Sequence, residues 1–90
     1  MKMKLNYDFA VQEVADMFVA VAKDRETGDP QKVFRLNETG ATIIEALQEG
    51  SDEKAIVARL TREFNVDEET ARKETTGFIQ MLTDNGLASL

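Results

Sequence analysis

The sequence predicts an α+β fold, in which a three-stranded antiparallel sheet comes first and three helices follow. Up to about residue 36, apolar residues alternate with polar ones or form short blocks, as they do in strands. From residue 38 to about residue 86 they recur every three or four positions, as they do in amphipathic helices. The 90 residues suffice for one modest core, and no linker or repeat divides them, so we expect a single domain over 1–90.

The first two expected strands form a hairpin. Phe9–Val14 is rich in β-forming residues, and Ala15-Asp16 suits a tight turn. Met17–Ala22 is a short apolar run, typical of a buried central strand. We therefore expect the second strand to lie in the middle of the sheet.

The third expected strand follows a polar loop over residues 23–31, which contains the turn signal Gly28-Asp29-Pro30. Within Lys32–Leu36, alternation places Phe34 and Leu36 on one face, the core side. Val33 and Arg35 point to the opposite face. This strand is expected to be an edge of the sheet.

Each expected helix has a capping residue and an end signal. The N-caps are Asn37, then Ser51 or Asp52, then Asp67, and Gly50 and Gly86 end the first and third helices. Each helix also carries one apolar stripe that is expected to face the core. The stripes are Ala41, Ile44 and Leu47; Ile56, Leu60 and Phe64; and Ala71, Phe78 and Leu82.

Composition excludes several classes of chemistry. The chain has no cysteine and no histidine, so the usual zinc, iron–sulfur and haem ligand sets and the Ser–His or Cys–His catalytic pairs cannot be assembled. We therefore expect a non-catalytic protein without a cofactor or a bound metal. No apolar run approaches the ~18 residues of a membrane span, and the N-terminus lacks the apolar segment of a secretory signal. These features predict a cytoplasmic protein that does not enter a membrane.

An ordered series of motifs carries a family resemblance. It begins at Phe34-Arg35-Leu36-Asn37-Glu38-Thr39-Gly40-Ala41, a Leu-Asn junction of strand and helix, and ends at Phe78-Ile79-Gln80-Met81-Leu82-Thr83-Asp84-Asn85-Gly86-Leu87. With Gly50 and the break at Phe64-Asn65-Val66 between them, residues 34–87 resemble the PqqD family of coenzyme PQQ synthesis proteins. The resemblance implies a winged-helix-like fold. It also implies a RiPP recognition element, which binds the leader of a ribosomally made precursor peptide and presents it to a modifying enzyme. In the namesake pathway that partner is a radical S-adenosylmethionine enzyme.

The resemblance implies that the leader adds as a further strand beside the third strand and lies against the third helix. An exposed strand edge has the unpaired backbone groups that this mode of binding needs. On this basis we expect apolar contacts from Val33 and Ile79, and pairing of acidic leader side chains with Arg35 and Arg72. Thr75 stands where the family often has an aliphatic residue. The predicted site residues are Lys32, Val33, Phe34, Arg35, Ala71, Arg72, Thr75 and Ile79.

Some interpretations stay open at this point. Arg72 and Lys73 are also spaced to pair with Glu68 and Glu69 at i+4 on the helix surface, and Ile79 suits either the groove or the core. A docking subunit of a larger enzyme, with no peptide groove, is one alternative function. A winged-helix DNA-binding regulator is another, but residues 67–85 hold five acidic and two basic side chains, which opposes contact with phosphates. We therefore expect no nucleic-acid partner.

Overall fold

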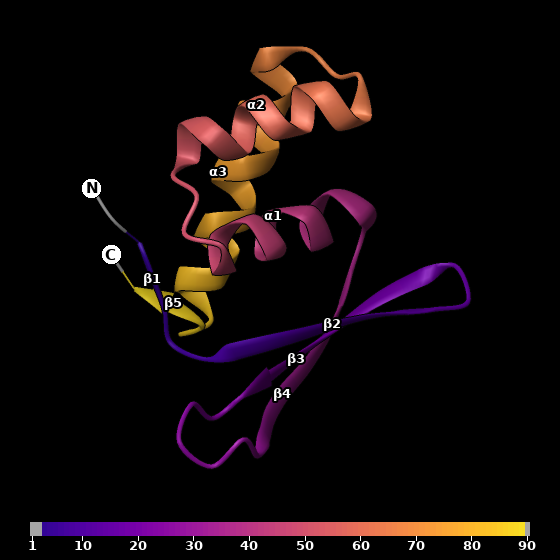
Figure 1. The fold of residues 1–90 in the computed structure, drawn as a ribbon. Helices are drawn as coiled ribbons and strands as arrows, with labels where there is room; N and C mark the ends of the chain where they lie inside the picture. Colours follow the sequence, from indigo (N-terminus) through magenta and orange to yellow (C-terminus); the bar gives the residue numbers. More distant parts are fainter. Residues whose placement is uncertain (1–2, 90) are drawn as a thin grey trace.

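The computed structural model describes residues 3–89 and has the predicted α+β architecture, a sheet followed by three helices (Figure 1). The elements are β1 Lys4–Leu5, β2 Asp8–Val14, β3 Met17–Lys23, β4 Pro30–Leu36, α1 Glu38–Gln48, α2 Glu53–Phe64, α3 Glu68–Asp84 and β5 Ala88–Ser89. The predicted fold class and order of elements are therefore confirmed.

The main sheet has the order β2-β3-β4, with β3 in the centre and both neighbours antiparallel to it. A two-residue turn joins β2 to β3, and Ala15 adopts the left-handed conformation there, at a φ of 56°. The third strand begins at Pro30, two residues before the predicted start. A proline at the first position of an edge strand costs no ladder hydrogen bond, so it does not exclude strand structure.

The three helices all lie on one side of this sheet (Figure 1), and α1 contacts each of its three strands. Strand residues that face α1 build the first core cluster, in which Phe9, Ala20, Ala22 and Leu36 are buried with Ile44 and Leu82. Phe34 is half-buried and meets Phe9 edge to face, with ring centroids 6.3 Å apart. Within residues 3–89, no helix covers the opposite face of the sheet.

A second core cluster joins the helices to one another. It contains Ile43, Ala46, Ile56, Val57, Leu60 and Ala71. Because α1 supplies buried residues to both clusters, it is the central element of the fold. The predicted stripes are confirmed as core-facing, with Phe64 and Phe78 half-buried at the margins.

The helix starts agree with the sequence analysis. Asn37, Asp52 and Asp67 are the N-caps, and each side chain accepts a hydrogen bond from the backbone N–H three residues later, at 2.8, 2.8 and 2.7 Å. Asp52 rather than Ser51 therefore caps α2. Asn65 ends α2 in the left-handed conformation, at a φ of 53°.

The sequence does not predict the small second sheet. In it, Lys4 pairs with Ser89 and Leu5 with Ala88, so the two ends of the described chain lie side by side (Figure 1). Strands of two residues leave no periodicity to detect. Leu5 and Leu87 are buried here, and the sheet fixes the end of α3 against β2.

Candidate functional site

The outer edge of β4 has free backbone groups. Because Val14 and Met17 flank a two-residue turn, they form a hydrogen-bonded pair, and such pairs then alternate along the β2–β3 ladder. On β3 this leaves residues 18, 20 and 22 to bond with β4, opposite Leu36, Phe34 and Lys32. The N–H and C=O groups of Val33 and Arg35 therefore point away from the sheet, toward a strand that could be added.

A shallow hollow of about 550 Å³ lies beside the end of β4. The start of α1 contributes Asn37, Gly40 and Ile43 to it. One side of α3, which we call the near side, contributes Thr70, Lys73, Glu74, Gly77, Phe78 and Met81. Phe78 and Met81 are half-buried and give the hollow an apolar floor. We call this hollow and the open edge of β4 together the candidate groove.

Polar contacts tie the near side of α3 to its neighbours. Lys32 Nζ donates to the carbonyl of Asn85 at 2.8 Å, which joins β4 to the end of α3. At the other end of the groove, the Thr39 hydroxyl lies 3.4 Å from Glu74 Oε2. The hydroxyl and the backbone N–H of Thr70 hold the pKa of Asp67 below its ordinary value, because both bond to its carboxylate. The first two contacts join α3 to β4 and to α1, and the third caps the start of α3.

Two glycines face the candidate groove for different reasons. A Cβ on Gly40 would lie 3.0 Å from the Phe78 ring and 3.1 Å from Asn37 Oδ1, so close packing of α1 on α3 explains this glycine. A Cβ on Gly77 would meet no atom within 4 Å. A glycine inside a helix costs about 1 kcal/mol relative to alanine, and nothing within the described chain requires it at this position. The space beside Gly77 on the surface of α3 is therefore open.

The structure separates the predicted site residues into three groups. All four residues of β4 lie at the open edge: Lys32 and Phe34 face the helices, while the side chains of Val33 and Arg35 lie on the outer face of the sheet. Only the backbone groups of the latter two point toward a strand that could be added. The expected contact of their side chains with a leader stays a prediction.

Ala71 and Thr75 are core residues. Both are 0% exposed, and the Thr75 hydroxyl donates to the Ala71 carbonyl at 2.8 Å, which satisfies its hydrogen-bonding need inside the core. Both side chains are buried in the free chain, and their expected direct contact with a leader stays a prediction.

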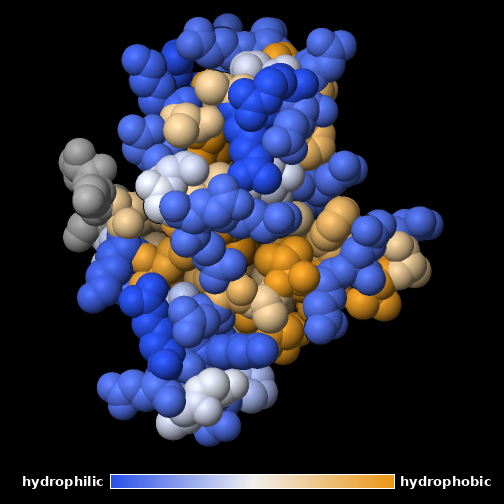
Figure 2. Space-filling model, in the orientation of Figure 1, coloured by the Kyte–Doolittle hydropathy of each residue, from blue (hydrophilic) through white to orange (hydrophobic). Residues whose placement is uncertain are grey.

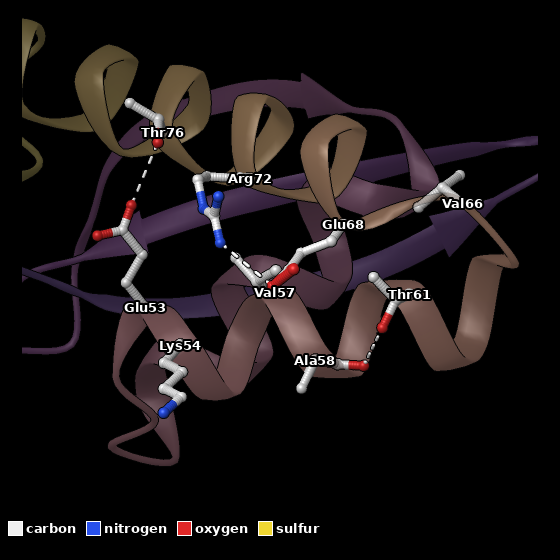
Figure 3. A pocket seen from close by; sticks show the side chains of 9 residues that line it. All are labelled: Glu53, Lys54, Val57, Ala58, Thr61, Val66, Glu68, Arg72 and Thr76. Carbon is white, nitrogen blue, oxygen red and sulfur yellow. Dashed lines mark hydrogen bonds and ion pairs between the residues drawn. The ribbon is translucent and has the colours of Figure 1, made fainter.

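Arg72 and Ile79 lie on the far side of α3, away from β4. Arg72 projects over a separate hollow of about 710 Å³ between α2 and α3, where it pairs with Glu68 at 3.2 Å (Figure 3). Ile79 borders a third hollow, with Leu47 and Gly50. Neither residue lines the hollow beside β4, and their expected contact with a leader stays a prediction. The i+4 ion pairs of Arg72 and Lys73 are confirmed.

Helical periodicity does not single out the residues on the near side of α3 that border the hollow. Gly77 is the one sequence signal on this side, because an isolated glycine inside a helix often has a packing or functional reason. Met81 lies within the closing motif, but its pattern is that of an ordinary core residue.

Among residues 3–89, no group of three or more acidic side chains is placed to hold a metal ion, and no helix is long and apolar enough to cross a membrane.

This fold and site define an α+β domain in which an open strand edge lies beside an apolar hollow. The family model of coenzyme PQQ synthesis protein D matches residues 19–88, and the chain belongs to this PqqD family. No sequence among curated proteins matches the chain.

Two solved structures are similar in fold. One is TbiB1 in complex with the TbiA(beta) leader peptide, with a TM-score of 0.71 and 24% identity over 96% of this chain and 94% of that one. The other is a lasso peptide synthetase B1 complexed with the leader peptide, with a TM-score of 0.73 and 23% identity over the whole of both chains. At these identities the likeness concerns the fold.

Proposed function

We propose that the chain is a non-catalytic adaptor that binds the leader of a ribosomally made precursor peptide and presents it to a modifying enzyme. The observation that carries the proposal is the open edge of β4 beside the apolar hollow. Membership of the PqqD family and the leader peptides bound by both structural neighbours support it. The adaptor acts as a single domain over 1–90, in the cytoplasm.

The leader adds as a fourth strand along β4. Val33 and Arg35 together offer two N–H donors and two carbonyl acceptors to it. Four net backbone hydrogen bonds are worth roughly 2–6 kcal/mol, whereas a micromolar Kd needs about 8 kcal/mol after the cost of association is met. Backbone pairing alone is therefore insufficient, and the leader must also bury apolar side chains.

The hollow is the place for those side chains. Every second residue of an added strand faces the helices, on the same side as Phe34. An aliphatic or aromatic leader residue at such a position meets Phe78 and Met81, and its full burial contributes roughly 1.5–3 kcal/mol. Two such anchors add roughly 3–6 kcal/mol to the contribution of backbone pairing.

Charge adds selectivity. Lys32 and Lys73 lie at the two sides of the groove, and both are exposed. The Lys32 ammonium favours a leader with an acidic side chain beside β4, whereas Lys73 already pairs with Glu69 at 3.5 Å and Glu74 also lines the hollow. Exposed pairs of this kind change affinity by only about 1 kcal/mol, so they refine the choice of peptide without determining it.

An amide NMR titration tests the proposal. The ligands are synthetic leaders from precursor-like reading frames beside this chain's own coding sequence, and a scrambled peptide is the control. The expected shifts cluster at Val33, Arg35, Gly77 and Met81. Shifts confined to the hollow between α2 and α3, or none with any leader, would show that the chain does not bind leaders by strand addition.

A further inference from the structure

The outer face of the β2-β3-β4 sheet is apolar and uncovered. The exposed large hydrophobic residues of the described chain are Val14, Met17 and Val33, at 52%, 41% and 65% exposure. The register places all three on this face, where Val14 lies opposite Met17 and Val33 opposite Val21. Figure 2 shows apolar surface at the tip of the β2–β3 hairpin. Exposed apolar residues gathered on one face mark an interaction surface.

The charges on this face differ from those of the rest of the molecule. Lys23 and Arg35 flank the apolar residues, and within residues 3–89 neither takes part in an ion pair. Asp8 also lies on this side, but it pairs with Arg25 at 3.8 Å. The chain as a whole carries −6, and residues 38–90 carry all of it, because residues 1–37 hold equal numbers of basic and acidic side chains. The face therefore suits a partner surface that is apolar with acidic residues at its rim.

The area of the face argues against a permanent dimer. Three strands of seven residues cover roughly 23 by 14 Å, or about 300 Å², from a rise of ~3.3 Å per residue and a strand spacing of ~4.8 Å. A stable interface buries about 800 Å² on each partner. A second copy would also bring the same two cations to the same patch. The occupant is thus a different protein that binds transiently.

The face continues onto the site of the leader. A strand added beside β4 extends the sheet, so alternate leader side chains lie in the same surface as Val33 and Arg35. We propose that this outer face is the docking surface for the folded enzyme that modifies the peptide, which binds the sheet and the added leader strand as one surface. The inference rests on the proposed function, because it needs a leader beside β4. Docking of this kind makes the enzyme bind an adaptor that carries a leader in preference to an adaptor without one.

The test uses the triple variant Val14→Thr, Met17→Gln and Val21→Thr, which alters the outer face away from the β4 edge and keeps every backbone group. The probe is the purified modifying enzyme encoded in the same gene cluster, titrated against fluorescently labelled chain with and without leader. Wild type should bind the enzyme more tightly when the leader is present. The triple variant should keep its leader Kd within twofold and lose at least tenfold in enzyme affinity. The exposed Ala58 on α2 supplies the matched control, Ala58→Gln, which should change neither.

Three outcomes contradict the inference. One is a triple variant that binds the loaded enzyme as wild type does. Another is a wild-type chain that sediments as a dimer while the triple variant is monomeric, which assigns the face to a second copy. The third is enzyme affinity that does not depend on the leader. A wild-type chain that binds no leader at all overturns the proposed function itself, and the leader titration alone reveals it.

Discussion

Replacement of Gly77 by alanine separates fold stability from peptide binding, because the two should change in opposite directions. Gly77 lies inside α3, where alanine is favoured over glycine by about 1 kcal/mol. The new methyl group meets no atom within 4 Å in the free chain, so nothing offsets this gain. Gly77→Ala should therefore raise the free energy of unfolding by about 0.5–1 kcal/mol.

Leader binding should weaken in the same variant. The methyl group enters the hollow where the leader passes close to α3, and one extra methyl in a packed contact costs about 1–3 kcal/mol. This corresponds to a Kd roughly 5- to 150-fold larger. Urea unfolding measures the first quantity and isothermal titration with the leader measures the second.

The matched control is Gln80→Ala, an exposed position of α3 outside the groove, which should leave the leader Kd unchanged. A more stable Gly77→Ala that binds leader as tightly as wild type would refute the placement of the peptide against this side of α3. A less stable variant would instead show that the helix geometry at Gly77 has been misjudged. Because stability and leader affinity are measured separately, loss of binding through unfolding of the variant would be recognised.

Three further predictions concern charge and the core. Leu60→Ala should lower the free energy of unfolding by roughly 2–5 kcal/mol in urea titrations, because Leu60 is 0% exposed between the helices. Asp67→Ala should lower Tm at pH 7. Since hydrogen bonds from Thr70 lower the folded-state pKa of Asp67, its stabilising effect is complete above the unfolded pKa of about 4. The Tm difference from wild type should therefore shrink as the pH falls toward 3 and below, and a pH-independent difference would contradict this. Lys32→Glu should weaken an acidic leader by about 1 kcal/mol in titration calorimetry, whereas Arg72→Glu, on the far side of α3, should leave it within twofold.

The sequence was sufficient for the elements and the core, since these depend on local periodicity and capping. The strands of the main sheet, the three N-caps and the apolar stripes follow from patterns within a few residues of one another. The pairing of Leu5 with Ala88 does not, because it joins residues from opposite ends of the chain through strands too short to show alternation.

The sequence predicted the β4 side of the candidate groove but not its α3 side. Strand alternation identified β4 as the edge and gave the faces of its side chains. Helical periodicity, however, identifies only the buried stripe of α3. Gly77 and Ile79 lie about 100° to either side of Phe78, so the pattern treats them alike. The side of α3 that faces β4 is set by the packing of α3 against α1, where Gly40 approaches the Phe78 ring. This packing is a tertiary contact, which local periodicity does not reveal.

Strand addition at β4 is the central claim, and Val33→Pro tests it most directly. The outward N–H of Val33 is not needed by the sheet, so the variant should fold, with a circular dichroism spectrum like that of wild type. Val33→Thr is the control, since it changes the side chain but keeps the N–H. In titration calorimetry we predict that Val33→Thr binds the leader within twofold of wild type and that Val33→Pro binds at least tenfold more weakly. A folded Val33→Pro that binds with wild-type affinity would contradict the account.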